Sequence, residues 1–76
     1  MTLQDRRAYC RRQYMHQATS QEDGACWLAE YEGLLIGAGL STAQAIGWPT
    51  HTARLRLWYL RGVEDGRVLR ALEHPS

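Results

Sequence analysis

Phenylalanine and lysine are absent from this sequence of 76 residues, and only two cysteines and two prolines occur. Cys10 and Cys26 form no Cys-x-x-Cys pair, and with the three scattered histidines they make no zinc-binding spacing. The N-terminus has no apolar signal segment, so we expect reduced, structural thiols rather than a disulfide framework. The sequence therefore predicts no metal site.

Long hydrophobic runs are also missing. The longest strongly apolar run, GLLIGAGL, is far too short to cross a bilayer. We expect a cytoplasmic protein that does not enter a membrane. A chain of this size buries only about 60% of the surface that its unfolded form exposes, which leaves room for one small core and none for a deep cleft beside it. Apolar residues make up 45% of the chain, enough for a compact single domain.

No catalytic signature occurs in the sequence. Ser41 and His51 come nearest to a nucleophile and a base, but nothing in the sequence orients either residue. The other histidines, His16 and His74, have no carboxylate or cysteine at a useful helical spacing. We therefore expect neither an enzyme nor a cofactor site.

Two helices are predicted before residue 40. Thr2 caps a first helix that runs from about Leu3 to His16, with Asp5 in the capping-box position. In the second helix, capped by Ser20, apolar residues recur at i, i+3, i+4 and i+7. Gly39 is a natural left-handed stop. The predicted segments are a basic N-terminal helix (1–19) and an amphipathic scaffold helix (20–39), followed by residues 41–62 and 63–76.

Charge is segmented along the chain, although its net value is only +1. Residues 1–19 have three positive charges in excess, 20–35 have four negative charges, and 50–62 again have three positive charges. The arginines of the first helix form either a solvated face or a clamp for phosphates or a partner's carboxylates. The acids of the second helix either solvate it or pair with those arginines, within a hairpin or across a dimer.

Residues 41–62 have the pattern of two helices joined by a tight corner. Ser41 begins a short helix that Gly47 ends, and Pro49 suits the first position of a longer helix that Gly62 closes. The sequence EDG is then a turn signal, and RVLRAL (67–72) is either a short strand or one more helical turn. The longer helix buries either Ala53, Leu57 and Leu60 or Leu55, Trp58, Tyr59 and Gly62, and periodicity does not choose between the two stripes.

Residues 25–72 resemble a winged helix-turn-helix DNA-binding domain, in which a scaffold helix (here CWLAEYEGLLIGAG) precedes the corner and a GRVLR-type strand opens the wing. The resemblance implies a mainly α fold: a small helical bundle with a helix-turn-helix and, in the strand alternative, a short C-terminal β wing. It also implies that PTHTARLRLWYLR lies in the major groove. On that basis Thr50, His51 and Arg54 read bases, and Arg56, Arg61 and Arg67 contact phosphates.

The leading hypothesis is a small transcriptional regulator that binds duplex DNA as a homodimer. The alternative is a protein-binding module, such as a phage- or plasmid-type inhibitor that docks on a host protein. For that alternative, the candidate interface residues are Trp58, Arg7 and Arg11, because tryptophan and arginine dominate protein interfaces.

Overall fold

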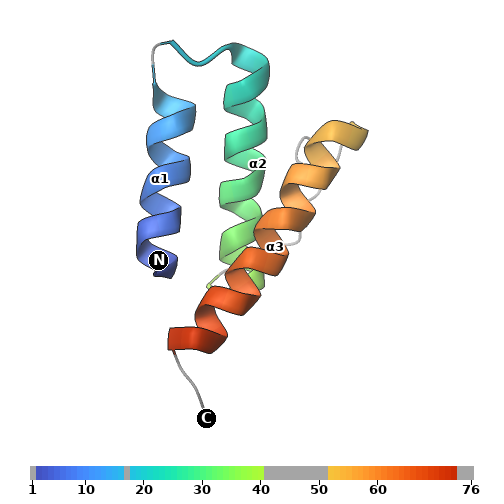
Figure 1. Ribbon diagram of the computed structural model, residues 1–76. Helices are drawn as coiled ribbons and strands as arrows, with labels where there is room; N and C mark the ends of the chain where they lie inside the picture. Colours follow the sequence, from blue (N-terminus) through green and yellow to red (C-terminus); the bar gives the residue numbers. More distant parts are fainter. Residues whose placement is uncertain (1, 17, 41–51, 74–76) are drawn as a thin grey trace.

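The computed structural model describes residues 2–16, 18–40 and 52–73, and these ranges form three α-helices (Figure 1). No strand occurs in these three ranges. The prediction of a mainly α fold built as a small helical bundle is therefore confirmed. The helices are α1 (Leu3–Met15), α2 (Gln21–Gly37) and α3 (Ala53–Glu73).

The ends of α1 and α2 follow the signals in the sequence. Thr2 Oγ1 accepts a hydrogen bond from the Asp5 amide at 3.1 Å, and Asp5 accepts one from the Thr2 amide at 3.3 Å, which completes the capping box. Ser20 Oγ accepts from the Asp23 amide at 3.1 Å. Gly39 has a φ of +73°, the left-handed conformation expected just after a helix. Local sequence therefore fixes the boundaries of the first two helices.

The start of α3 differs from the prediction. Thr52 is not helical, and its Oγ1 accepts a hydrogen bond from the Leu55 amide at 3.1 Å, as a capping residue does. The helix therefore begins at Ala53 and not at Pro49. The corner itself, with Gly47 and Trp48, lies outside the described residues, so the helix-turn-helix stays a prediction.

The end of α3 also differs from the prediction, because the helix continues through Gly62 and through residues 64–66 to Glu73. The expected helix end at Gly62 and the expected turn are therefore wrong. So is the strand alternative for 67–72, and with it the root of a wing, since these residues are helical. A glycine inside a helix costs about 1 kcal/mol relative to alanine, but Gly62 and Gly66 are both buried against α2, and this packing offsets the cost.

The helices are arranged around α2 (Figure 1). α1 and α2 form an antiparallel hairpin, and α3 crosses α2 diagonally while running in the same direction as α2. The C-terminal end of α3 returns to the start of α1, where the Leu3 amide donates a hydrogen bond to Glu73 Oε1 at 2.8 Å. None of the three described helices combines the length and the apolar character that crossing a membrane requires.

α2 and α3 pack backbone against backbone. Each helix contributes two glycines four positions apart, and this spacing puts both on one helical face: Gly33 and Gly37 on α2, Gly62 and Gly66 on α3. A Cβ atom on Gly33 would lie 2.8 Å from the Val63 nitrogen, and one on Gly37 would lie 2.9 Å from the Val63 Cα. Real Cβ atoms essentially never come this close to other atoms. The two helices approach this closely only because these side chains are missing.

α1 packs on α2 through side chains instead. Tyr9 meets Trp27 edge-on with 5.4 Å between ring centroids, and Tyr14 meets Tyr31 at 6.0 Å. Such edge-to-face pairs add about 0.5–1.5 kcal/mol to the burial of the rings. The buried cluster beneath consists of Leu3, Cys10, Leu34 and Ala38, with Trp27, Tyr31 and Leu69 packed against it.

Candidate functional site

The face of α3 that points away from α2 carries four exposed aliphatic side chains. Leu57 is 65% exposed, Leu60 53%, Val68 44% and Leu72 70%. Their spacing of three, eight and four positions keeps them on one side of the helix, with Glu64 filling the gap. We call this surface the outer face of α3; it comprises Leu57, Leu60, Glu64, Val68 and Leu72 with the exposed arginines Arg56, Arg61 and Arg67.

The glycines decide which stripe of α3 is buried. The close approach of α2 requires Gly62 and Gly66 to face it, so the residues beside these glycines turn inward. The stripe Leu55, Trp58, Tyr59 and Gly62 is accordingly buried or half-buried. The other stripe considered in the sequence, Ala53, Leu57 and Leu60, is exposed. Of the two stripes that periodicity left open, the second is therefore the buried one, and Leu57 and Leu60 lie on the surface.

Glu64 interrupts the apolar stripe, but its charge is neutralised within the helix. Arg67 Nη2 donates to Glu64 Oε1 at 2.7 Å and to Oε2 at 2.9 Å, and Arg67 Nε donates to Oε2 at 3.3 Å. An exposed pair of this kind contributes little stability, about 0.3–0.5 kcal/mol at this helical spacing. Its consequence here is electrostatic, because the acid in the stripe is covered by a neighbouring guanidinium.

The remaining arginines of the outer face surround the leucines. Arg61 lies over the Trp58 ring at 5.4 Å from its centroid, which fixes one side of the guanidinium. No ion pair joins Arg56, Arg61 or Arg70 to another residue of the described ranges. The outer face thus carries three arginines and one glutamate, an excess of two positive charges.

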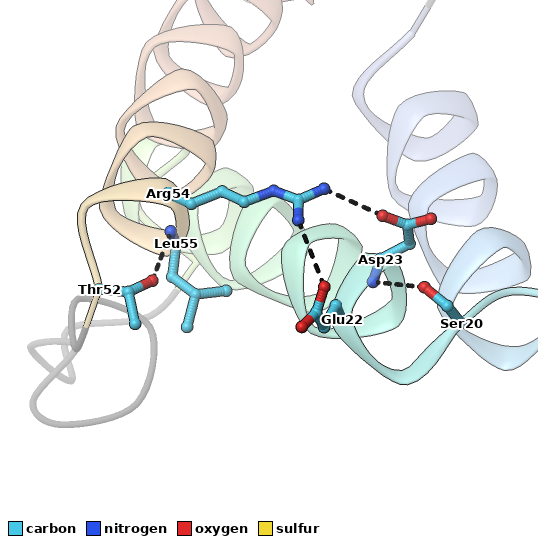
Figure 2. A network of polar contacts seen from close by, with 6 residues as sticks. All are labelled: Ser20, Glu22, Asp23, Thr52, Arg54 and Leu55. Atoms are coloured by element: carbon cyan, nitrogen blue, oxygen red, sulfur yellow. Dashed lines mark hydrogen bonds and ion pairs between the residues drawn. The ribbon is translucent and has the colours of Figure 1, made fainter.

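Arg54, predicted to read a base, is engaged with acids of α2 instead (Figure 2). Its Nη2 lies 3.0 Å from Asp23 Oδ1, and its Nη1 lies 3.8 Å from Glu22 Oε2. Figure 2 shows the side chain reaching across from α3 toward the first turn of α2. All three side chains are more than half exposed, so the pairs are weak and screened by salt.

Among the described residues, the other arginines predicted to bind DNA are not brought together with Arg54. Thr50 and His51 lie outside the described residues. Arg56, Arg61 and Arg67 all lie on the outer face, and Arg67 is bound there to Glu64. Two acids therefore surround the arginine nearest the start of α3, while the outer-face arginines stand beside leucines.

Of the predicted protein-interface residues, Arg7 and Arg11 lie together on α1, whereas Trp58 lies on α3. Trp58 is half-buried and meets Trp27 edge-on at 5.0 Å, so it belongs mainly to the α2–α3 packing. Arg7 is half-buried with its guanidinium 6.0 Å from the Tyr31 ring, and Arg11 is exposed on α1. These side chains form no common surface with the outer face of α3.

A buried ion pair joins α1 to α2. Arg6 Nη2 lies 2.5 Å from Glu30 Oε1, with Glu30 fully buried and the Arg6 side chain only 18% exposed. The expected pairing of first-helix arginines with second-helix acids is thus found within the hairpin. Burial, followed by the nearby Glu30 carboxylate, raises the pKa of the Cys10 thiol to about 12. Both cysteines are free and buried, which makes them poor nucleophiles.

A groove of about 250 Å³ lies between α1 and α3 at the edge of the outer face. Val68 belongs to both surfaces. The groove's other lining residues are Arg6, Asp65 and Leu69, so it has an apolar wall and two charged rims. Among the described residues, no group of three or more metal-ligating side chains comes together.

Sequence reasoning missed the outer face, although a signal for it was present. Gly33 with Gly37 and Gly62 with Gly66 repeat the same four-residue spacing in two separate helices. Matching pairs of this kind indicate two helices that touch through glycine faces. They would have assigned Gly62 to the interior of α3 and the leucines to its surface.

Comparisons with models of protein families, with curated proteins and with solved structures each find no match for this chain.

Proposed function

We propose that this protein is a protein-binding module that docks on its partner through the outer face of α3. The observation that carries the proposal is the exposure of four aliphatic side chains on one side of one helix, between 44% and 70% each. Single exposed leucines are common on soluble proteins and need no explanation. Three leucines and a valine in line along one helix, bordered by arginines, have the composition of an interface with an apolar centre and a charged rim.

The proposal is supported by the way in which α3 is held. Its glycines fix the helix rigidly against α2, so the outer face is presented as a preformed ridge. A rigid surface loses little conformational entropy when a partner binds. At 1.5 Å per residue, α3 offers a ridge about 30 Å long.

The test compares two double variants of the full chain. Leu57→Gln with Leu60→Gln removes the centre of the outer face while keeping residues that favour a helix. Met15→Gln with Leu40→Gln is the matched control, because these two side chains are also exposed, by 64% and 45%, but lie outside α3. We expect a stoichiometric partner from the native host to remain with the parent and the control and to be lost from the α3 variant. A partner retained equally by all three proteins would contradict the proposal.

DNA binding as a homodimeric regulator is the second candidate function. It is favoured by Arg56, Arg61 and Arg70, which are exposed and have no ion pair within the described residues. The test is a titration of duplex DNA at several salt concentrations. DNA binding would show a steep loss of affinity with salt that becomes shallower in Arg56→Ala and Arg61→Ala. The leucine variants, by contrast, would leave it nearly unchanged.

A further inference from the structure

The proposed function leaves the chemistry of the partner open, and the inference drawn here rests on that function. The outer face combines an apolar stripe with an excess of positive charge. Arg56 lies one helical turn from Leu60, and Arg61 lies one turn from Leu57, so a guanidinium flanks each side of the leucine pair. The stripe contains one acid, Glu64, which is already bound by Arg67. A partner that covers this stripe must bring its own negative charges to the arginines.

A second copy of this chain does not meet that requirement through the same face. Pairing α3 with α3 would bring an excess of two positive charges against an equal excess. Like charges brought together in an interface cost several kcal/mol, which opposes this arrangement. The acids at the start of α2, Glu22 and Asp23, are already engaged with Arg54. The charge distribution therefore favours a different molecule.

Nucleic acid supplies negative charge but does not fit the leucines. Protein–DNA interfaces are more polar than protein–protein interfaces, and most of their contacts reach phosphate and sugar. A phosphate backbone laid along the outer face would have Leu57, Leu60 and Leu72 beneath it. Burying these side chains requires apolar atoms from the partner.

The shape of the surface indicates the form that the partner takes. The apolar residues follow a single helix over residues 57–72, so the matching element is long, straight and apolar along one side. An amphipathic helix has this form and recognises its partner through residues at i, i+3, i+4 and i+7. The groove beside Val68, with Leu69 in its wall, offers a place for one apolar side chain of such a helix.

We infer that the outer face of α3 binds an acidic amphipathic helix of another protein. The apolar side of the partner helix covers Leu57, Leu60, Val68 and Leu72, and the carboxylates of the partner helix pair with Arg56 and Arg61. The apolar contact supplies most of the affinity, whereas the charges select the partner and speed its approach.

The inference can be tested with three synthetic peptides of about 21 residues, the length of α3. The first carries leucines at helical spacing flanked by glutamates. The second has lysine in place of every glutamate, and the third has the composition of the first in an order that destroys the apolar stripe. Binding of each fluorescent peptide to the full chain is followed by anisotropy at about 50 and about 500 mM NaCl, which changes the screening length several-fold.

We expect the acidic amphipathic peptide to bind at least about tenfold more tightly than either of the others at low salt, with a weaker preference at high salt. The Leu57→Gln, Leu60→Gln variant should lose this binding, and the Met15→Gln, Leu40→Gln control should keep it. The variant Arg56→Glu, Arg61→Glu should reverse the preference and bind the lysine peptide. Circular dichroism shows whether that variant keeps its helices, since Arg61 also contacts Trp58.

Each other result overturns the inference in a distinguishable way. Equal binding of the glutamate and lysine peptides removes the charge selection but leaves the outer face as a docking surface. Equal binding of the shuffled acidic peptide, or of duplex DNA, indicates a site for polyanions. Self-association that depends on Leu57 and Leu60 makes a second copy the occupant. No binding of any peptide rejects an acidic helix as the partner, while the capture experiment still decides whether the outer face binds a protein.

Discussion

The two interfaces of α2 are built on opposite physical principles. Toward α3 it presents glycine, and the two backbones touch with no side chain between them at the crossing. Toward α1 it presents aromatic rings and the fully buried carboxylate of Glu30, which pairs with Arg6. The α2–α3 interface depends on the lack of side chains at the glycines, whereas the α1–α2 interface depends on ring contacts and on an ion pair.

This difference determines what each interface tolerates. A backbone contact has no rotatable groups that can yield, so any added side chain must push the helices apart. A side-chain contact can rearrange, and the loss of one ring removes only part of the stabilisation that the contact provides. We therefore expect α3 to be held rigidly against α2, and α1 to be the helix that detaches more readily.

The largest effect is predicted for a side chain added at the crossing of α2 and α3. In Gly62→Val the new atoms meet the backbone of Glu30, whose Cα would lie 3.1 Å from the Cβ. We expect a loss of about 3 kcal/mol or more in the free energy of unfolding, at the upper end of overpacking effects. Urea denaturation followed by circular dichroism measures it.

Gly24→Ala is the matched control for this prediction. Gly24 lies in α2 as well, but its nearest neighbour to a new Cβ is the Tyr14 carbonyl oxygen at 3.6 Å, which is ordinary contact. The substitution should stabilise the protein by about 0.5–1 kcal/mol through the helix preference of alanine. If both substitutions change stability by similar amounts, the backbone contact does not hold α3.

The second effect, smaller than the first, concerns the buried ion pair. Arg6→Met leaves the Glu30 carboxylate buried without its partner. Breaking such a pair costs about 3–5 kcal/mol when burial is complete, but Arg6 retains some exposure, and water can reach the site when it is gone. We therefore expect a loss of about 2–3 kcal/mol. The double variant Arg6→Met, Glu30→Met should recover most of it, because no charge then remains buried.

Labelling of the two cysteines shows which part of the molecule Arg6→Met loosens. Cys10 is buried beside the ion pair, and Cys26 lines a separate cavity of about 240 Å³ near the start of α3. With a pKa near 12, the Cys10 thiol is protonated at pH 8 and reacts only when α1 moves away. Arg6→Met should speed labelling of Cys10 by about tenfold or more while changing Cys26 little. Equal acceleration at both thiols would mean that the molecule opens as one unit.

Local signals in the sequence were sufficient for the hairpin. Thr2, Ser20 and Gly39 act on backbone groups within a few residues of themselves, so their effect does not depend on the rest of the fold. The end of α3 could not be predicted in this way. Gly62 and the following EDG have the local chemistry of a helix end and a turn, but their contact with α2 outweighs that tendency.

The candidate site was predictable only in part for the same reason. The arginines of α3 stood out as a group, and three of them do lie on one exposed face with the leucines. Which stripe faces α2 is a property of the pair of helices, and the period of one helix alone leaves it undecided. The partner of Arg54 was likewise out of reach, since Asp23 is far away in sequence.

The smallest effect is predicted at the start of α1, where the helix is fixed by its capping box. Thr2→Val keeps the shape of the side chain but removes the oxygen that accepts from the Asp5 amide. We expect a loss of about 1 kcal/mol, with Thr2→Ser close to the parent.

Hydrogen bonds from Thr2 lower the pKa of Asp5. The stability that this carboxylate contributes is therefore present above the pKa that Asp5 has in the unfolded chain, near 4, and is lost as the pH falls. The Thr2 amide, the larger cause of the lowered pKa, remains in Thr2→Val, so only the part of the difference that comes from the hydroxyl and the carboxylate should shrink in acid, as thermal unfolding monitored between neutral and acidic pH would show. A difference that stays constant would mean that the hydroxyl acts through the Asp5 amide alone and not through the Asp5 carboxylate. Because α1 contacts its neighbours through side chains, this loss should also speed labelling of Cys10 more than that of Cys26.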